Sequence, residues 1–466
     1  MINTRQNVTF SIGNLAIIDK ADADFGFFKD VFGDLAGKAG SFLPSIKLLI
    51  YNRLGECHSL RRLPEFTPLE LIEMLDGKEL IPERTLNRNV SRLGKKAVFA
   101  VENLQQFVVK HKLADNIQHV DFSSTFFAGS KCPLGKLGYS RDHEPGRPQI
   151  TFGISVGSNK IPTALTIQKG NVVDKEHMKS MLKLCKHVLA KDSLLIFDCG
   201  GNTKKNKQKI RKLDFHYLTL KPKIKRAYKE LIEVFKQNEP EKIEINDETY
   251  LCVKTWKDGE FVYIFYSEKL RDDQLRIKKV KFARKLVKGD VLLKKVKKGK
   301  ELKPQISREG WIVTRGCLQR TLEKVRNPFV IGIEGFFALE CSQDLEPAVV
   351  LMLYKDRDKA EKLIRDMKEG TETRPMRHWS KDAVIGYMLV VFLTNFLINL
   401  TLLFAKNPLV KNLKLLKKYL KNSTLTVVYP KNRFRFAVAA NISAENRSIF
   451  GDFIEKYGEK ELGLRW

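Results

Sequence analysis

Two aspartates lie at the ends of apolar segments whose composition is typical of β-strands. Asp121 follows Val120 within the predicted strand 117–127, and Asp198 ends the predicted strand 193–198. If these strands are neighbours in a mixed sheet, the two carboxylates lie at the same edge, about 4.8 Å apart. Carboxylate oxygens at that separation suit divalent cations such as Mg²⁺. The spacing therefore predicts a metal site with two aspartate ligands.

A third carboxylate, Glu361, lies in a segment with a helical repeat. At about 100° per residue, it shares one face of a single helix with four groups suited to phosphate binding. These groups are Tyr354, Arg357, Arg365 and Lys368. The opposite face carries Ala360, Leu363, Ile364 and Met367. One acid among cations favours a metal-bound phosphate, with the carboxylate on the metal and the cations on the phosphate. The alternative is a solvated, charged helix.

The segments around these residues predict a mixed sheet. Three strands, 117–127, 148–157 and 161–170, follow one another as an antiparallel meander. A helix at 174–190, the strand 193–198, a helix at 202–213 and a strand at 216–221 come next. The predicted order is β-β-β-α-β-α-β, an α/β core that holds both aspartates.

An insertion, residues 224–345, interrupts this core. It contains a predicted hairpin that turns at Lys257-Asp258-Gly259 and a lysine-dense run, 278–303, suited to a DNA backbone. Trp256 and Trp311 are candidates for stacking on a flipped base, although burial in the insertion's own core is the simpler expectation for each. The core resumes at 346–405, and residues 406–466 form a C-terminal region with an expected role in dimerisation.

Residues 1–117 predict a helical N-terminal domain. Thr67 and Glu70 have the spacing of a capping box at the start of one helix. A second helix, 83–93, carries Arg84, Arg88 and Arg92 four residues apart. This pair resembles a helix-turn-helix, in which a basic polar stripe enters the major groove of DNA. A solvated face on a packed helix is the alternative.

The charge balance points to a polyanionic partner. The 466 residues include 84 Lys plus Arg and 54 Asp plus Glu, a net charge of +30. Seven scattered cysteines without a C-x-x-C pair favour a reducing, cytoplasmic setting. The uncharged stretch from Val384 to Phe404 is long enough to span a membrane, but Thr394 and Asn395 interrupt it. A buried core helix is therefore the preferred interpretation.

The spacing Tyr354-(2)-Arg357-(3)-Glu361-(6)-Lys368 resembles the Y-(2)-R-(3)-E-(6)-K signature of DDE transposases of prokaryotic insertion sequences. Several other segments also resemble that group: residues 138–154 (GYSRDHEPGRPQITFGI), Gly170-Asn171, Gly335-Phe336-Phe337 and Arg374-Pro375-x-x-His378-Trp379. The resemblance extends from about residue 119 to residue 404. It implies an RNase H-like catalytic core with a mixed five-stranded sheet, a β-rich insertion and a buried apolar helix after the catalytic one.

The resemblance also implies a function. Asp121, Asp198 and Glu361 would bind two Mg²⁺ ions, for which Mn²⁺ can substitute, to cut the ends of an element and join them to target DNA. Tyr354, Arg357 and Lys368 would contact phosphates near the element's end. The implied partners are double-stranded DNA, as terminal inverted repeats and target, and a second copy of the chain, in the nucleoid and without a membrane. A catalytically inactive or domesticated DNA-binding protein and a metal-dependent nuclease are the alternatives.

Overall fold

The chain divides into two compact units, which are described separately. The computed structural model describes residues 7–36, 40–297, 311–314, 317–320, 329–405, 413–430 and 435–459. The first unit comprises Met1–Phe215 with Asp356–Trp466, and the second comprises His216–Lys355. The second unit therefore contains the predicted insertion 224–345, the predicted strand 216–221 and Tyr354.

A helical layer forms one part of the first unit. Its helices are α1 (Ile12–Phe25), α2 (Phe27–Ala36), α3 (Phe42–Leu54), α4 (Leu69–Met74), α5 (Glu83–Lys95) and α6 (Ala97–Lys110), with a 3₁₀ turn at Leu63–Phe66. Phenylalanine rings fill its interior, among them Phe27, Phe28, Phe32, Phe42 and Phe107, all nearly inaccessible to solvent. These rings pack edge-on or stacked, arrangements that add to the free energy gained from burial alone.

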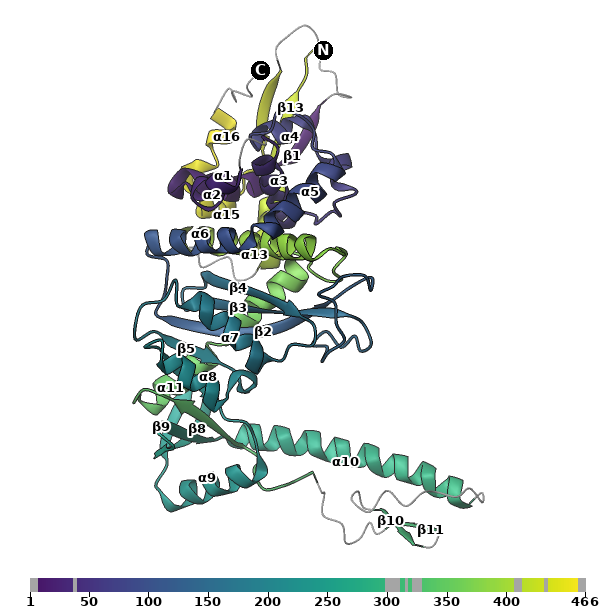
Figure 1. The fold of residues 1–466 in the computed structure, drawn as a ribbon, viewed down its shortest axis with the longest axis vertical. Helices are drawn as coiled ribbons and strands as arrows, with labels where there is room; N and C mark the ends of the chain where they lie inside the picture. The colour runs from purple at the N-terminus through teal and green to yellow at the C-terminus, as the bar shows by residue number, and fades with distance from the viewer. Residues whose placement is uncertain are drawn as a thin grey trace. The chain divides into compact units, whose positions relative to one another are not determined.

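A mixed sheet forms the other part of the first unit (Figure 1). Its strands are β2 (Ile117–Phe126), β3 (Gln149–Gly157), β4 (Pro162–Lys169) and β5 (Leu194–Phe197). They lie in the order β4-β3-β2-β5, antiparallel except for the parallel pair β2 and β5. Helix α7 (Asp174–Cys185) packs on β3 and β4, and α12 (Asp358–Arg365) packs on β2 and β3. The predicted α/β class with a mixed sheet is confirmed, and so is the order of these elements.

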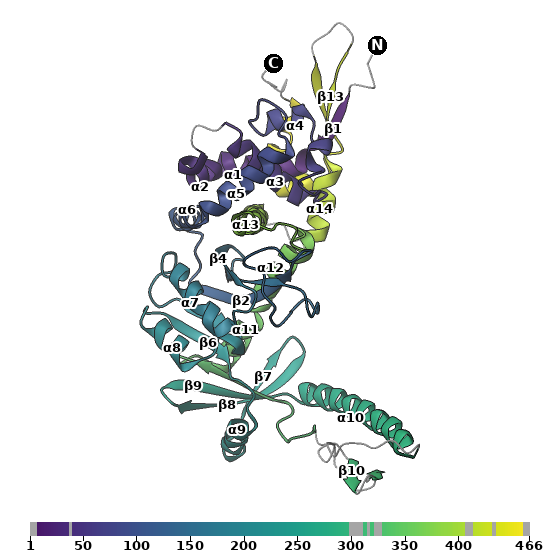
Figure 2. The ribbon, with the colours of Figure 1, turned by 45° about the vertical axis from the view of Figure 1, so that its right-hand side comes forward.

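Helix α13 (Lys381–Ala405) lies between the helical layer and strand β4, as Figure 2 shows. Its length and hydropathy would allow it to cross a membrane, but it contacts α1, α3, α5, α6 and β4. Val384, Leu389, Phe392 and Phe396 are almost fully buried by these elements. The helix is therefore part of the protein core, as preferred from the sequence.

Two glycines allow α5 and α13 to cross at backbone contact. A Cβ atom on Gly94 would lie 1.8 Å from the carbonyl oxygen of Asp382, and one on Gly386 would lie 1.9 Å from that of Val90. Real Cβ atoms do not approach backbone oxygens so closely, so any larger residue would push the helices apart. The side chains of α5 thereby take a fixed position relative to the segment that leads into α13.

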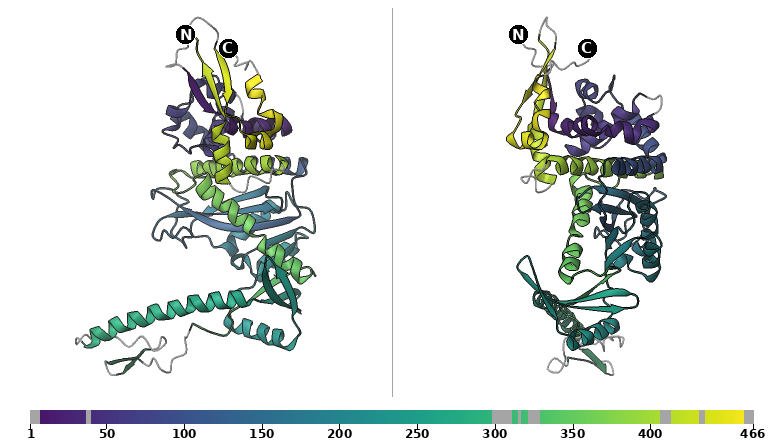
Figure 3. Two further views of the ribbon diagram at one scale, coloured as in Figure 1. Left: turned by 180° about the vertical axis from the view of Figure 1, so that it is seen from behind. Right: turned by 90° about the vertical axis from the view of Figure 1, so that its left-hand side faces the viewer.

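The two ends of the chain form one small sheet (Figure 3). Strand β1 (Val8–Ser11) pairs antiparallel with β13 (Thr424–Val428), which pairs with β14 (Phe436–Ala440). Helix α14 (Leu413–Asn422) packs on α1, as does α15 (Ala444–Phe450), and α16 (Lys456–Glu459) follows. In α16, the hydroxyl of Tyr457 donates to Asp19 of α1 at 2.5 Å. The described residues 413–430 and 435–459 thus complete the N-terminal helical layer, a relationship that the sequence did not predict.

The second unit combines antiparallel strands with three helices among its described residues. Its strands are β6 (His216–Leu220), β7 (Glu241–Ile245), β8 (Glu248–Lys257), β9 (Glu260–Tyr266) and β12 (Phe336–Cys341), ordered β6-β12-β9-β8-β7, with the separate pair β10 (Trp311–Thr314) and β11 (Cys317–Arg320). Its helices are α9 (Lys225–Gln237), α10 (Glu268–Lys297) and α11 (Pro347–Lys355). The hairpin predicted to turn at Asp258-Gly259 is confirmed, and both residues have the positive φ that such a turn needs.

The structure contradicts the prediction for Trp256 in the insertion, and it does not describe most of the side chains for which the other predictions were made. Trp256 is 60% exposed and lies edge-on against Phe261, so the expectation of a buried side chain is wrong for this residue. The side chain of Trp311 and most of those of the lysine-dense run 278–303 lie outside the described residues.

The predicted capping box at α4 is wrong. The hydroxyl of Thr67 donates to the carbonyl oxygen of Leu63, which belongs to the preceding 3₁₀ turn, at 2.7 Å. The carboxylate of Glu70 accepts a hydrogen bond from Tyr429, near the C-terminus. Pro68 occupies the N-cap position, and α4 has only six residues. A local bond to the preceding turn therefore uses the Thr67 side chain, and a tertiary contact uses that of Glu70.

Replacement of Gly386 by alanine tests the α5–α13 crossing. We expect Gly386→Ala to lower the free energy of unfolding by about 3 kcal/mol or more, because its Cβ would overlap the Val90 carbonyl oxygen. Gly33→Ala is the matched control, since Gly33 lies in α2 with no atom within 4 Å of a Cβ, and alanine should stabilise that helix slightly. Thermal melts compare the two, and equal melting temperatures for Gly386→Ala and wild type would contradict the constraint.

Candidate active site

Asp121 and Asp198 lie side by side on neighbouring parallel strands. Strand β2 pairs with β5 in a register that places Val120 opposite Phe197. The next residue of each chain segment is the aspartate, so both carboxylates lie at the same sheet edge. The side chain of Asp198 accepts a hydrogen bond of 2.7 Å from the backbone amide of Cys199, which fixes the start of a 3₁₀ turn at Cys199–Gly201. The neighbouring strands expected from the sequence are therefore present.

Glu361 is brought to the same edge by α12, which packs on β2 and β3. Ala360, Leu363 and Ile364 form the buried face of this helix, as the sequence predicts. Glu361 is 43% exposed at its side chain. Asp121 lies close to the other two carboxylates, because Glu361 and Asp198 both raise the pKa of Asp121.

The pKa of Asp121 rises to about 6, mainly because the side chain is buried. The guanidinium of Arg357 acts in the opposite direction and stabilises the ionised form. Burial among other carboxylates makes the charge of Asp121 costly unless a cation lies close by. The edge of the sheet is therefore a position where positive charge is stabilising.

Arg357 supplies positive charge between two of the carboxylates. One of its terminal nitrogens lies 3.7 Å from Oδ1 of Asp121, and the other lies 2.5 Å from Oε1 of Glu361. The Arg357 side chain is only 17% exposed. Among the described residues, no three His, Cys, Asp or Glu side chains are grouped closely enough to hold a metal ion. The donor chemistry, three carboxylates, is nevertheless the one that Mg²⁺ and Mn²⁺ prefer.

The expectation that Tyr354 to Lys368 form one continuous helix is wrong. Helix α11 ends at Lys355 and α12 begins at Asp358, and residues 366–370 form a π-helical turn. At the break, the amides of Lys359 and Ala360 bond to carbonyl oxygens three residues back, where the α-helical pattern would use four. Angles calculated for a single helix therefore do not relate Tyr354 to Glu361. Tyr354 lines a small cavity within the second unit, together with Tyr250 and Phe337.

Lys368 takes part in a buried ion-pair network that the sequence did not predict. Its ammonium lies 2.8 Å from Oδ1 of Asp142, and a guanidinium nitrogen of Arg374 lies 2.9 Å from the same oxygen. The side chain of Asp142 is 1% exposed. Burial lowers the pKa of Lys368, and Asp142 opposes this effect. Residues 138–154 resemble a segment of the DDE transposases, but nothing in their pattern identifies Asp142 as the partner of Lys368.

The remaining predicted DNA contacts differ in their accessibility. Arg365, Arg84 and Arg88 are exposed, the first on α12 and the others on α5. Arg92 donates to the carbonyl oxygen of Leu35 at 2.8 Å, and its guanidinium lies 4.8 Å from the centre of the Phe42 ring. Arg92 therefore links α5 to Leu35 of α2 and Phe42 of α3, whereas Arg84 and Arg88 face solvent.

Comparison with known proteins gives a structural likeness but no sequence match. The chain matches no protein-family model and no curated protein sequence. Its structure is similar to one described as "Cryo-EM structure of piggyBac transposase synaptic complex with hairpin DNA", at 12% sequence identity and a TM-score of 0.41. The alignment covers 88% of this chain and 78% of that one.

Loss of the Asp142 carboxylate tests the buried network. We expect Asp142→Asn to lower the free energy of unfolding by about 3 kcal/mol, because the buried ammonium of Lys368 would lose its counter-charge and Arg374 would keep only its pair with the exposed Glu369. Glu144→Gln is the control, since Glu144 pairs with Arg147 at the surface, where such pairs contribute little. Chemical denaturation of both variants gives the comparison. Equal destabilisation would show that the Asp142 network is no stronger than a surface pair.

Proposed function

We propose that the protein is a DNA transposase that cuts the ends of an insertion sequence and joins them to target DNA by DDE phosphoryl transfer. The observation that carries this proposal is the proximity of three acidic residues: Asp198 and Glu361 both act on the pKa of Asp121, and Arg357 lies between Asp121 and Glu361. Asp121 and Asp198 come from the parallel pair β2 and β5, and Glu361 comes from α12, which packs on β2. The order of strands and helices in the first unit supports an RNase H-like core.

The three carboxylates are the proposed ligands of two Mg²⁺ ions. Bound there, such ions would activate a water or 3′-hydroxyl and stabilise the leaving oxygen. Asp121 and Asp198 approach from adjacent strands and are held by the sheet, whereas Glu361 is more exposed and approaches from a helix. The oxygen donors of Asp121 and Asp198 are therefore held in place, whereas that of Glu361 can adjust its position toward a metal ion.

Arg357 has a distinct proposed role. Its guanidinium offsets the negative charge of Asp121 and Glu361 in the protein alone, and five N–H donors leave it able to bind a phosphate as well. Arg365 on the same helix is exposed and extends the cationic surface. Lys368 acts through Asp142, since their ion pair anchors the turn that follows the catalytic helix. We therefore assign phosphate contact to Arg357 and Arg365, and positioning to Lys368.

Double-stranded DNA is the proposed partner, as inverted repeats at the element's ends and as target. The net charge of +30 supports it, and so do Arg84 and Arg88 on the exposed face of α5. Two ends must be processed together, which favours a homodimer in the DNA complex. The proposed location is the nucleoid.

Substitution of each acidic residue tests the catalytic assignment. We expect Asp121→Asn, Asp198→Asn and Glu361→Gln to reduce nicking of labelled DNA at an element end by more than about 1000-fold, or about 4 kcal/mol of barrier. DNA affinity, measured by anisotropy, should change little. Asp358→Asn is the matched control, because Asp358 lies on the same helix, is exposed and pairs with Lys362. A variant that loses binding as well as cleavage would mean that its carboxylate is structural. Binding without cleavage by the wild type would favour a DNA-binding protein without catalysis.

Metal dependence gives an independent test. We expect Mg²⁺ or Mn²⁺ to raise the melting temperature of the wild type, because the ions bind the folded carboxylate cluster. The increase should be absent in Glu361→Gln and present in Asp358→Asn. EDTA should abolish nicking, and Mn²⁺ should restore it. An equal thermal shift in wild type and Glu361→Gln would argue against metal binding by Glu361.

A further inference from the structure

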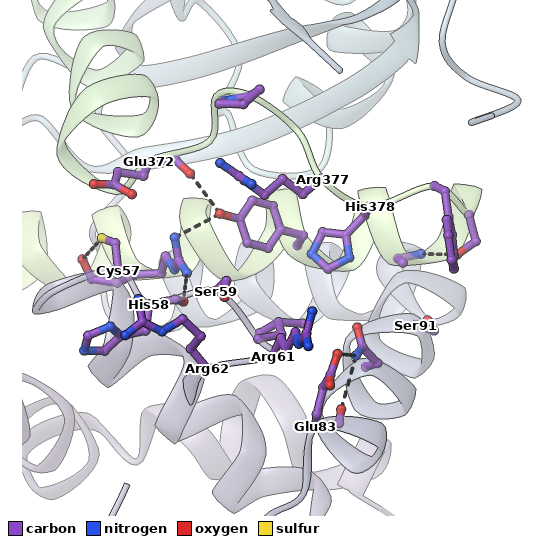
Figure 4. Close-up of a pocket in the computed structure, with 18 of the residues that line it drawn as sticks. Cys57, His58, Ser59, Arg61, Arg62, Glu83, Ser91, Glu372, Arg377 and His378 are labelled. Atoms are coloured by element: carbon purple, nitrogen blue, oxygen red, sulfur yellow. Dashed lines mark hydrogen bonds between the residues drawn. The ribbon is translucent and has the colours of Figure 1, made fainter. Parts of the chain in front are cut away.

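A groove lined by arginines lies in the first unit, formed by segments far apart in the sequence. Its volume is about 1020 Å³. Three segments contribute: residues 53–62 after α3, the start of α5, and the segment 372–387 that leads into α13. Figure 4 shows Arg61 and Arg62 on one side of the space, with Arg377 and His378 across from them. We call this feature the arginine groove.

The charge of the arginine groove favours an anion. Six arginines and three glutamates line it. One of these glutamates, Glu56, already pairs with Lys421. Arg61, Arg62, Arg84 and Arg377 are exposed to solvent and are thus available to a ligand. The lining therefore keeps an excess of positive charge.

A buried arginine adds to this excess. Arg53 is 4% exposed, and it donates to the hydroxyl of Tyr387 at 2.9 Å and to the carbonyl oxygen of His58 at 2.9 Å. No carboxylate within the described residues forms an ion pair with it. A buried guanidinium with neutral partners alone is costly, so a negative group in the groove would be stabilised.

Aromatic rings accompany the cations. Trp379 is 70% exposed, although tryptophan is among the side chains that gain most from burial. The ring of His378 packs against Tyr387, with 4.8 Å between centroids. Burial and the charge of Arg53 lower the pKa of His378 to about 4, so the ring is neutral at physiological pH. Cationic grooves with exposed aromatic rings are the usual arrangement for binding a single nucleic-acid strand.

The volume of the groove favours a single DNA strand over a duplex as its ligand. Cavities of about 300–1000 Å³ enclose molecules the size of a drug, and a few nucleotides of one strand are comparable. A DNA duplex is far larger, since its major groove alone is about 12 Å wide. We propose that the arginine groove binds one unpaired DNA strand, with phosphates on Arg61, Arg62 and Arg377 and a base stacked on Trp379. This inference rests on the proposed function, in which strand cleavage exposes such ends.

The groove is physically connected to the candidate active site. Met376 forms a bridge with Phe127 just after β2, through its amide to the Phe126 carbonyl oxygen at 2.8 Å and its carbonyl oxygen to the Ala128 amide at 2.9 Å. Arg374 pairs with Asp142, the partner of Lys368. The segment that carries Arg377 and Trp379 is thus attached both to the strand of Asp121 and to the turn after Glu361. A strand held in the groove would follow a defined path relative to the carboxylates.

The test measures binding of the full-length protein to a labelled single-stranded DNA of about 15 nucleotides, within the range that such grooves bind. We expect Arg61→Ala combined with Arg377→Ala to weaken binding at least tenfold and to reduce the slope of log affinity against log salt by about 1.4, or about 0.7 per lost phosphate contact. Trp379→Ala should weaken binding by about tenfold or more, and Trp379→Phe should restore most of it. Arg447→Ala, a surface arginine paired with Glu455, is the control and should change neither quantity.

The outcomes separate this inference from the proposed function. Unchanged single-strand affinity and salt slope in the groove variants would overturn the inference, even if the wild type cleaves DNA. An equal loss of affinity for a duplex of the same sequence would assign the groove to double-stranded DNA and overturn the strand proposal. Tighter binding of the matching RNA would overturn the assignment to DNA. Groove-dependent binding of the single strand by Glu361→Gln, without cleavage by the wild type, would support the groove and contradict the transposase proposal.

Discussion

The backbone contact between α5 and α13 is the constraint on which the rest of the first unit depends. Gly94 and Gly386 allow the two helices to cross with no side chain between them. Helix α13 packs against both the helical layer and β4. The N-terminal helices and the sheet that carries the candidate site are therefore built on one shared element. A change at this crossing would reach the exposed arginines of α5 and the segment 372–387 together.

Electrostatic compensation organises the candidate site and its surroundings. Asp121 and Glu361 share Arg357, and Asp142 is shared by Lys368 and Arg374. In each case a carboxylate in a poorly solvated position is stabilised by a cation from the segment 357–374. This short segment follows one unit boundary and precedes α13. It links the candidate site to the arginine groove through charged contacts. A sequence pattern does not show the contacts with Asp121 and Asp142, because these two residues are distant from the segment in sequence.

The sequence predicted local structure better than it predicted contacts between distant segments. The strands β2 to β5 and the hairpin of β8 and β9 follow from alternating apolar residues and turn residues, signals that lie within each segment. That Asp121 and Asp198 are neighbours depended on the condition that β2 and β5 pair, which the structure meets. The break between α11 and α12 was missed, because the helical angles assumed continuity and the turn leaves no glycine or proline as a marker. Thr67 and Glu70 have the local spacing of a capping box. In the structure, however, Thr67 donates to the Leu63 carbonyl oxygen and Glu70 accepts from Tyr429.

Pairing of β1 with β13 has a consequence for synthesis on the ribosome. The first hundred residues leave the ribosome long before residues 413–459, which supply α14, α15 and two of the three strands of the terminal sheet. Until then, the apolar side chains of α1 that pack on α14 and α15 remain uncovered. The backbone groups of β1 that bond to β13 also remain unpaired. The helical layer is thus completed only after α14, β13, β14 and α15 have been synthesised. A chain terminated before residue 413 would carry Asp121, Asp198 and Glu361 but lack β13 and β14, and its exposed apolar surface would make it a substrate for chaperones and proteases.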